Sequence, residues 1–266
     1  MRSLAIGATG MLAQQTNVDV ISNNIANMNT TAYTKRRAEF NDLLYQNIIR
    51  PGSASTSSDT IVPSGIQLGL GVRTAAVYRI TDGTSLTNTN NTLDLAIRGR
   101  GYFQIELPRP RMARSSVLLD RDGAFQRNGD GVIVTHDGYV VQPEITIPDD
   151  AVEIYVNNSG EVWIKQDGET DETNVGQLEL ATFPNEAGLE AMGQNLFLET
   201  EASGAPIIDN PDTESFGSVL QGYLETSNVN PVAEITELVS AQRAYEMNSK
   251  IIQTSDQMLS TITSLR

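Results

Sequence analysis

Apolar residues recur every seven positions at both ends of the chain, between mostly polar neighbours. Near the amino terminus the repeat comprises Leu4, Met11, Val18 and Ile25. Near the carboxyl terminus it comprises Leu238, Tyr245, Ile252 and Leu259, flanked by Ile235 and Ile262. A narrow apolar seam with this spacing is typical of coiled-coil helices and differs from the broad stripe of a helix on a large core. The pattern therefore predicts a long helix at each end, with a seam for pairing.

Neither predicted helix can bury its seam alone, because isolated helices of this length are marginally stable in water. The simplest partner for each is the other end of the same chain, since domain termini usually lie close together. The outer faces are rich in Asn, Gln, Ser and Thr and poor in charge, which favours packing against further copies. Pro231 suits the first turn of the C-terminal helix, and the Asn- and Thr-rich stretch 28–34 should end the N-terminal one. We also expect a short helical piece at 40–45.

The segment 46–71 combines a polar half with an apolar one. Its defining residues are Pro51, Pro63, Ile66, Leu68 and Leu70. Residues 50–65 are rich in Ser, Thr, Pro and Gly, which by itself indicates a loop. The three apolar residues then alternate with small or polar ones, and the alternation up to residue 80 is typical of a strand with one buried face. Because the first half is too polar to be buried in its own domain, we predict an extended arm that packs on an adjacent subunit.

The middle of the chain is predicted to be an antiparallel all-β domain. Short runs with strand-like composition fall at 93–97, 102–107, 132–135, 139–141, 152–156, 162–165, 177–182 and 195–198. Asp-Gly, Asn-Gly and Ser-Gly pairs separate many of them and supply the positive φ that tight hairpins need. The expected fold class is therefore α+β, with N- and C-terminal helices that form a coiled coil. The expected division is an N-terminal assembly segment at 1–45, the arm at 46–71, the β domain at 72–225 and a C-terminal assembly helix at 226–266.

The charge and composition of the chain exclude several kinds of partner and site. The formal net charge is −15, and Lys165 is the only basic residue between Glu144 and Glu225. A nucleic-acid partner needs a basic footprint, so none is expected. The chain has no cysteine, which removes disulfides, thiolate nucleophiles and cysteine-based metal sites. No run approaches the roughly 20 apolar residues that span a bilayer. We expect no cleavable secretory signal either, because its apolar region is missing.

Few residues could carry chemistry. His136 is the only histidine and stands in a predicted turn, where histidines are usually solvated. Asp120 and Asp122 could act as an acid pair or bind calcium, but the EF-hand spacing is missing and an acidic turn is expected. Gly99 and Gly101 lack the third glycine of a phosphate loop and precede a strand-like run, so they should allow a sharp turn. We therefore predict no catalytic, cofactor-binding or metal-binding residue.

Separated segments of the chain resemble the signatures of a known family. Residues 17–27, with the sequence NVDVISNNIAN, are similar to the N-terminal signature of the axial proteins of the bacterial flagellum, which build its rod and hook. The segments similar to the central and C-terminal signatures are 86–97, 99–103, 120–125, 224–230 and 242–250. The resemblance covers nearly the whole chain in the right order, which argues against a chance match.

Within this family, residues 46–52 and 63–69 resemble the extra segment of the distal-rod members, which hook and proximal-rod members generally lack. The resemblance implies a non-enzymatic, cofactor-free subunit of the distal rod of the basal body. Such subunits polymerise helically into a hollow drive shaft that crosses the periplasm and transmits torque from motor to hook. The implied partners are further copies of the chain, the proximal rod proteins, the hook protein, the peptidoglycan and outer-membrane ring proteins, and the flagellar type III export apparatus.

The chain departs from the family pattern at two places. Residues 108–114 form a longer and more basic stretch than the usual hairpin, and Ala32-Tyr33 replaces the usual Gly-Phe. Two alternatives stay open at this point. One is a hook or proximal-rod subunit, against which the segment 46–71 argues. The other is a periplasmic enzyme or glycan-binding protein, for which turnover or a stoichiometric ligand would decide.

Overall fold

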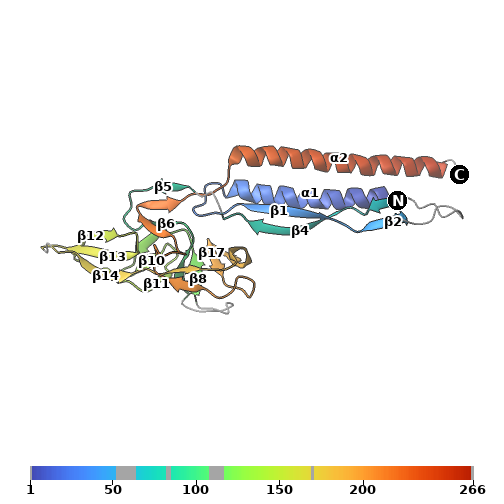
Figure 1. The fold of residues 1–266 in the computed structure, drawn as a ribbon. Helices are drawn as coiled ribbons and strands as arrows, with labels where there is room; N and C mark the ends of the chain where they lie inside the picture. Colours follow the sequence, from blue (N-terminus) through green and yellow to red (C-terminus); the bar gives the residue numbers. More distant parts are fainter. Residues whose placement is uncertain (1, 52–63, 82–84, 108–116, 169–170, 265–266) are drawn as a thin grey trace. The chain divides into compact units, whose positions relative to one another are not determined.

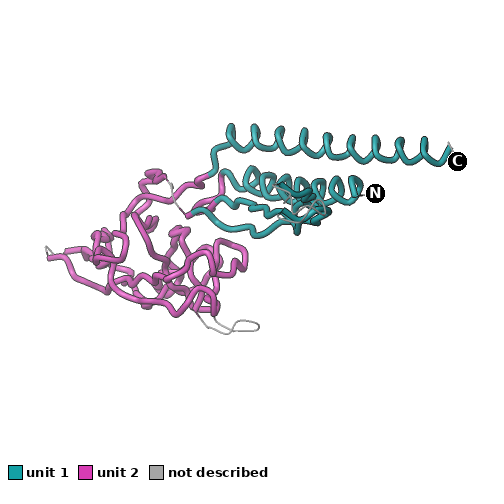
Figure 2. The backbone as a smooth tube through the Cα atoms, turned by 45° about the vertical axis from the view of Figure 1, so that its right-hand side comes forward, with its two compact units in different colours: residues 1–28, 35–80, 229–266 teal, residues 29–34, 81–228 magenta. Residues whose placement is uncertain are grey.

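Two helices at the chain ends and antiparallel strands between them make up the computed structural model, which describes residues 2–51, 64–81, 85–107, 117–168 and 171–264 (Figure 1). The chain divides into two units. Unit 1 comprises residues 1–28, 35–80 and 229–266, and unit 2 comprises residues 29–34 and 81–228 (Figure 2). The predicted α+β class, with terminal helices and a central antiparallel β domain, is confirmed.

Unit 1 contains the two helices, α1 (Arg2–Ala26) and α2 (Pro231–Ser264). They lie side by side (Figure 1) and run antiparallel, because Gly7 near the start of α1 contacts Ile252 in the second half of α2. At the opposite end, Asn24 in the last turn of α1 bonds Glu234 in the first turn of α2. The predicted helix start at Pro231 is confirmed, and the N-terminal helix ends just before the predicted Asn- and Thr-rich stretch.

A β ribbon accompanies the helices of unit 1. Its strands are β1 (Arg36–Asp42), β2 (Tyr45–Ile49), β3 (Ile66–Gly69) and β4 (Val72–Arg79). β1 pairs antiparallel with β4, and β2 pairs antiparallel with β3. The N–H of Leu43 donates to the C=O of Gly71 over 2.8 Å, and the N–H of Leu70 donates to the C=O of Leu44 over 3.2 Å. These bonds join the two hairpins into one ribbon, and β1 and β4 both contact α1.

The ribbon corrects two sequence predictions. The short helix expected at 40–45 is wrong, because Phe40 pairs with Thr74 across the ribbon and β2 begins at Tyr45. The buried face expected for the alternating residues Ile66, Leu68 and Leu70 is also wrong within the chain, since they are 47%, 42% and 38% exposed. β4 belongs to unit 1, so the boundary drawn at residue 72 does not coincide with the unit boundary after residue 80.

Unit 2 holds the remaining strands, all paired antiparallel. Its largest sheet has the order β16-β17-β8-β7-β11-β10-β9, with β15 pairing both β7 and β18. These strands are β7 (Tyr102–Glu106), β8 (Val117–Asp120), β9 (Phe125–Arg127), β10 (Ile133–Thr135), β11 (Val140–Gln142), β15 (Leu180–Thr182), β16 (Glu190–Gly193), β17 (Leu196–Leu198) and β18 (Ile207–Asp209). The smaller sheets are β12 (Ala151–Val156), β13 (Glu161–Gln166) and β14 (Thr173–Gln177), then β6 (Leu95–Arg98) with β19 (Ser218–Gln221), and β5 (Leu86–Asn88) with β20 (Tyr223–Glu225). A short 3-10 helix, η1, spans Glu186–Gly188.

The core of unit 2 is apolar and drawn from several sheets. Phe103 and Phe125 meet edge to face with ring centroids 5.1 Å apart, and aliphatic side chains from the two larger sheets and from β6 and β19 surround them. The positive φ expected of the Asp-Gly and Ser-Gly pairs is present, for example 83° at Gly131 and 78° at Gly160, whereas Gly129 of the Asn-Gly pair is not in this conformation. The strand expected at 177–182 divides into β14 and β15. Between them the N–H of Leu178 donates to the C=O of Gly160 instead of to a ladder partner, over 2.8 Å.

Candidate assembly interface

The two helices of unit 1 meet through small residues. A Cβ atom added to Gly7 would lie 2.9 Å from Cγ1 of Ile252, and one added to Gly10 would lie 2.8 Å from Nδ2 of Asn248. A side chain at either position would therefore displace its neighbour on α2. Glycine within a helix costs about 1 kcal/mol relative to alanine. The close approach of the two helices is what these glycines provide in return.

The buried residues of both helices are mostly small or polar. On α2 they are Glu234, Ala241 and Ser255, which share one heptad line with Asn248. On α1 they are Gly7, Ala13, Ile21 and Asn24. The apolar seam predicted for α2 occupies the neighbouring heptad line, four residues further along. The contact between the helices is thus centred on a polar and small-residue line, with the apolar seam beside it.

The predicted seam residues lie along the edges of this contact. The half-buried ones are Leu4, Met11, Val18, Ile25, Leu238, Ile252 and Leu259. The exposed ones are Ile235, Tyr245 and Ile262. The structure brings Val18 and Tyr245 together in one groove of about 370 Å³, and Ile252 against Gly7. The role of the ten residues as an assembly seam stays a prediction.

Many large apolar side chains of unit 1 remain exposed on the helices. On α2 they are Val232, Ile235, Val239, Tyr245, Met247, Ile251, Met258 and Ile262. On α1 they are Ile6 and Leu12. A scattered exposed residue is ordinary, whereas such a concentration on one pair of helices favours a surface for other chains.

The β2–β3 hairpin is a second exposed apolar surface of unit 1. Its exposed large residues, with the adjoining link, are Leu44, Tyr45, Ile48, Ile49, Ile66, Leu68 and Leu70. In the described part of the chain these two strands pair only with each other. A part of a ribbon that has only two strands is at best marginally stable in water unless another surface packs on it. Of the two prolines that bound the predicted arm, Pro51 is exposed at the end of the described stretch and Pro63 lies outside the described residues.

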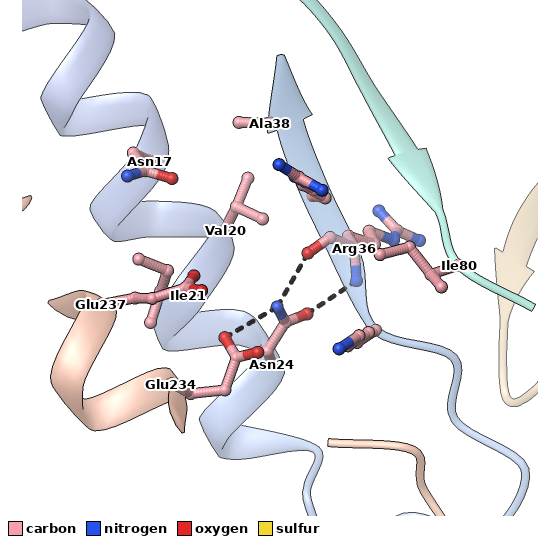
Figure 3. A pocket seen from close by; sticks show the side chains of 11 residues that line it. Asn17, Val20, Ile21, Asn24, Arg36, Ala38, Ile80, Glu234 and Glu237 are labelled. Atoms are coloured by element: carbon pink, nitrogen blue, oxygen red, sulfur yellow. Dashed lines mark hydrogen bonds between the residues drawn. The ribbon is translucent and has the colours of Figure 1, made fainter. Parts of the chain in front are cut away.

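A polar pocket of about 190 Å³ lies where α1, α2 and β1 meet (Figure 3). Oδ1 of Asn24 accepts a hydrogen bond from the N–H of Arg36 over 2.9 Å. Nδ2 of Asn24 donates to the C=O of Arg36 over 2.8 Å and to Oε2 of Glu234 over 3.1 Å. Asn24 and Glu234 are only 1% and 6% exposed. The pocket is therefore closed on one side by a buried amide–carboxylate pair.

Charges of both signs line this pocket. Arg36 and Arg37 of β1 and the preceding Lys35 are among the residues that line it. Glu234 and Glu237 line it from α2 (Figure 3). Glu234 stands in the first turn of α2, where the helix dipole stabilises a negative charge.

The start of α2 is fixed by the residue before it. Oδ1 of Asn230 accepts hydrogen bonds from the N–H groups of Val232 and Ala233, over 3.1 and 3.3 Å. This side chain acts as an N-cap and satisfies two of the backbone donors that every helix start leaves open. The cap, together with Pro231, sets where the helix begins and hence where Glu234 stands.

The acidic segment expected to be a turn in unit 2 is partly buried. Asp120 ends β8, and its burial raises the pKa of that carboxyl to about 7. Burial also raises the pKa of Asp122. Between them, Nε of Arg121 donates to Oε2 of Glu225 over 2.6 Å. Burial lowers the pKa of Arg121, but the charge and hydrogen bond of Glu225 outweigh it and the net shift is upward.

The next question is where the other candidate residues of unit 2 lie. Arg121 also donates to the C=O of Gly99 over 2.8 Å, so the charged cluster ties β8 to the turn before β7 and to the end of β20. His136 is exposed in its turn. Among the residues that the structure describes, no three His, Cys, Asp or Glu side chains gather in a way that could hold a metal ion. No described helix is long and apolar enough to cross a membrane.

Comparisons with known proteins identify the family. Three family models match: the flagella basal body rod protein over residues 4–34, the D1 domain of flagellar hook protein FlgE/F/G over 96–164, and the C-terminal region of flagellar basal body rod FlgEFG protein over 220–265. The flagellar basal-body rod protein FlgG of Caulobacter vibrioides is 54% identical over 266 residues, 100% of both chains. The chain belongs to the FlgG family. A second FlgG, from Agrobacterium fabrum, is 53% identical over 99% of this chain and 98% of that one.

Membership in the FlgG family makes the chain a structural subunit of the flagellar basal-body rod, and not an enzyme. The resemblance found in the sequence is confirmed, and the alternative of a periplasmic enzyme is wrong. A crystal structure of the Helicobacter pylori flagellar hook protein FlgE2 covers 61% of this chain and 47% of its own at 14% identity. Its TM-score is 0.26.

In this FlgG-family chain, the repeat of large apolar residues does not predict the centre of the helix contact. On α1 that centre comprises Gly7, Gly10 and Asn24. On α2 it comprises the polar heptad line Glu234, Ala241, Asn248 and Ser255. A usable signal was present, because this line precedes the apolar seam by four residues throughout, as two facing heptad positions do.

Proposed function

We propose that this FlgG-family subunit builds the distal rod, polymerising helically into a hollow drive shaft that transmits torque from motor to hook. The main support for this proposal is the exposed apolar surface of unit 1. α1, α2 and the β2–β3 hairpin all expose large apolar side chains, whereas unit 2 buries a core of its own. Contacts between identical subunits that do not close into a ring produce filaments.

Within this proposal, α1 and α2 form a coiled coil. Two features support it: their antiparallel contact, and the two heptad lines on α2 that lie four residues apart. The assembly segments of the proposal are 1–45 and 226–266, with the ten seam residues at the edges of the helix contact. In the polymer, neighbouring copies would cover these edges and the exposed outer face of α2.

The segment 46–71 is proposed to be the arm that contacts an adjacent subunit. The exposure of Ile66, Leu68 and Leu70 supports this, because a two-stranded hairpin with these side chains in water needs a partner surface. An adjacent copy in the same tube is the partner available to every subunit. The arm would then connect neighbours laterally.

The further partners of the proposal follow from the place of a distal rod. They are the proximal rod proteins at one end, the hook protein at the other, and the peptidoglycan and outer-membrane ring proteins around the tube as it crosses the periplasm. Delivery would be by the flagellar type III export apparatus.

Electron microscopy of the concentrated, purified protein tests the proposal. Straight hollow tubes are the expected result. A variant with Ile251→Asp and Met258→Asp puts charge on the exposed apolar surface of α2 and should remain unassembled. The matched control, Val152→Asp with Tyr155→Asp, adds the same charge at exposed apolar positions of unit 2 and should still form tubes. A wild-type protein that never forms tubes, or an α2 variant that assembles like the control, would overturn the proposal.

A further inference from the structure

Asn24 uses its whole amide in the contact between three elements. Its oxygen accepts the N–H of Arg36, and its nitrogen donates to the C=O of the same residue and to the carboxylate of Glu234. Asn24 thus pairs with β1 as another strand would, while it also holds α2. Aspartate has the same shape but offers no donor for the last two bonds. Glutamine has the donors on a side chain one carbon longer.

Glu234 depends on that amide because it is buried. Its side chain is 6% exposed, and Asn24 supplies a hydrogen bond that its Oε2 accepts over 3.1 Å. Burying an ionised carboxylate is costly unless it is paired and hydrogen-bonded. An alignment of the helices that separates these two residues therefore leaves a buried carboxyl group without this donor.

The apolar seam by itself does not define how far α2 lies along α1. Its residues repeat every seven positions, so a slide of one heptad brings an equivalent large residue into each place. The polar line does not repeat in this way, because Glu234 is followed by Ala241 and then Asn248. A slide of one heptad puts Ala241 opposite Asn24 and carries Glu234 away from its donor.

We propose that Asn24 and Glu234 are positioning residues that set the register of the helix pair. Their bond, together with the two bonds to β1, is satisfied in one alignment of α1, α2 and the ribbon. The inference deepens the proposed function and rests on it for its consequence in the rod. A slip of one heptad displaces α2 by about 10.5 Å along its axis. A subunit with that error would present its outer apolar residues at the wrong level of the tube.

Disulfide trapping can read the register directly, because the chain has no cysteine of its own. A Cβ atom at residue 10 would lie 3.0 Å from Cγ of Asn248. The Cβ atoms of Gly10→Cys and Asn248→Cys should therefore come within about 4.5 Å, which is inside disulfide range. Combining Gly10→Cys with Ser255→Cys or with Ala241→Cys reports a slip of one heptad in either direction. Both of these variants also carry Asn248→Ser, so that the side chain added at residue 10 does not itself displace Asn248. In protein isolated from cells before assembly, the 10–248 cross-link should exceed each of the others by about tenfold or more.

Four backgrounds then test the proposal with these three cysteine pairs: wild type, Glu234→Gln, Glu234→Leu and Asn24→Asp. Glutamine keeps an oxygen that accepts the Asn24 bond, so Glu234→Gln should keep the wild-type ratio. Glu234→Leu and Asn24→Asp should lower the ratio of native to slipped cross-links at least about fivefold. Wild-type ratios in both would overturn the proposal. A second outcome would also overturn the proposal: Glu234→Leu loses all three cross-links, and Glu234→Gln cross-links normally. The pair would then hold the helices together without selecting a register.

The cross-links are read on denatured chains, both before and after assembly, and so separate this inference from the proposed function. The cross-link ratios could change among the four backgrounds as expected in a protein that never forms tubes. That result would support the positioning role and contradict the proposed rod. Should Asn24→Asp fail to accumulate in cells, the comparison of Glu234→Leu with Glu234→Gln decides alone.

Discussion

Units 1 and 2 differ in whether their large apolar side chains are buried or exposed. Unit 2 packs Phe103, Phe125 and the aliphatic residues around them into a core that water does not reach. On its helices unit 1 buries Ile21 and otherwise small or polar residues, and it leaves many of its large apolar side chains in solvent. Burial of apolar surface is the dominant favourable contribution to folding. We infer that unit 2 is stable by itself and that unit 1 is completed by contacts with other copies.

The largest effect that can test this contrast comes from removing the helices. Deleting residues 2–26 or 231–264 should abolish polymerisation, because either deletion removes one partner of the helix pair. Unit 2 should keep its cooperative thermal transition, since its core includes no residue from either helix. Calorimetry and electron microscopy of the same samples check both outcomes. Loss of the cooperative transition would show that the two units do not divide these roles.

The end point of that deletion matters, because residues 29–34 belong to unit 2. The N–H of Ala32 donates to the C=O of Glu225 over 2.8 Å, and Nδ2 of Asn195 donates to the C=O of Thr31 over 3.1 Å. Extending the deletion through residue 34 should therefore lower the melting temperature of unit 2 by roughly 4–8 °C. The shorter deletion serves as its control.

A smaller change should separate the assembly seam from the rest of α2. Replacing Leu238, Ile252 and Leu259 together by Ala should block assembly, because each side chain that assembly buries contributes roughly 2–5 kcal/mol. Alanine keeps the helix, since it has the highest helix propensity. Exposed polar residues of the same helix supply the matched control, a triple alanine variant at Ser240, Gln253 and Gln257. Motility of complemented cells at equal protein levels is the measurement, and equal motility of the two variants would contradict the seam.

The sequence was a better guide to the helices and the fold class than to the contacts between elements. The helices were predictable because the apolar heptads and Pro231 are local signals. Strands β5 and β20 were not, because each has three residues and pairs with the other from a distant part of the chain. Asn24 and Glu234 were missed for a related reason: their significance depends on a bond between residues 210 positions apart. Asp120 was assigned to a turn because Arg121, Asp122 and Gly123 follow it, whereas its burial comes from the rest of unit 2.

The burial of Asp120 predicts a pH dependence confined to unit 2. In the unfolded chain this carboxyl titrates near 3.8, and in the folded protein near 7. Between these values the folded state holds a proton that the unfolded state has released. The contribution to stability is therefore present below the unfolded pKa and is lost as the pH rises through about 7. The free energy of unfolding should fall by up to about 1.4 kcal/mol per pH unit in this window.

Asp120→Asn tests this contribution with little change in shape. Asparagine keeps an oxygen that can accept the N–H of Asp122, as Asp120 does over 2.9 Å. The melting temperature of the variant should vary less between pH 5 and 8 than that of the wild type, and a remaining slope is expected from Asp122. Asp130→Asn is the matched control, because it makes the same change at a carboxyl that is exposed in a turn of unit 2. An unchanged slope in Asp120→Asn would contradict the assignment.

Changes in the arm should have the smallest effect on assembly but a clear effect on the stiffness of the tube. A drive shaft must stay straight, and a tube bends when its neighbouring rows of subunits slide past each other. The β2–β3 hairpin exposes Ile66, Leu68 and Leu70, so an adjacent subunit that covers them would oppose such sliding. Because the helices supply the main contacts, deleting residues 50–65 should leave subunits that polymerise into a more flexible tube. The persistence length of rods in electron micrographs measures the change.

Two further variants locate the effect of that deletion. Ile66→Ser with Leu68→Ser removes apolar contacts of the arm while keeping its length, and should soften the tube to a lesser degree. Gln67→Ser lies between these residues on the same strand, where successive side chains point to opposite faces, and should leave stiffness unchanged. Deletion rods as straight and stiff as the wild type would mean that the arm does not connect neighbours. Softening by Gln67→Ser equal to that of the double variant would mean that the alternation along β3 does not define the contact face.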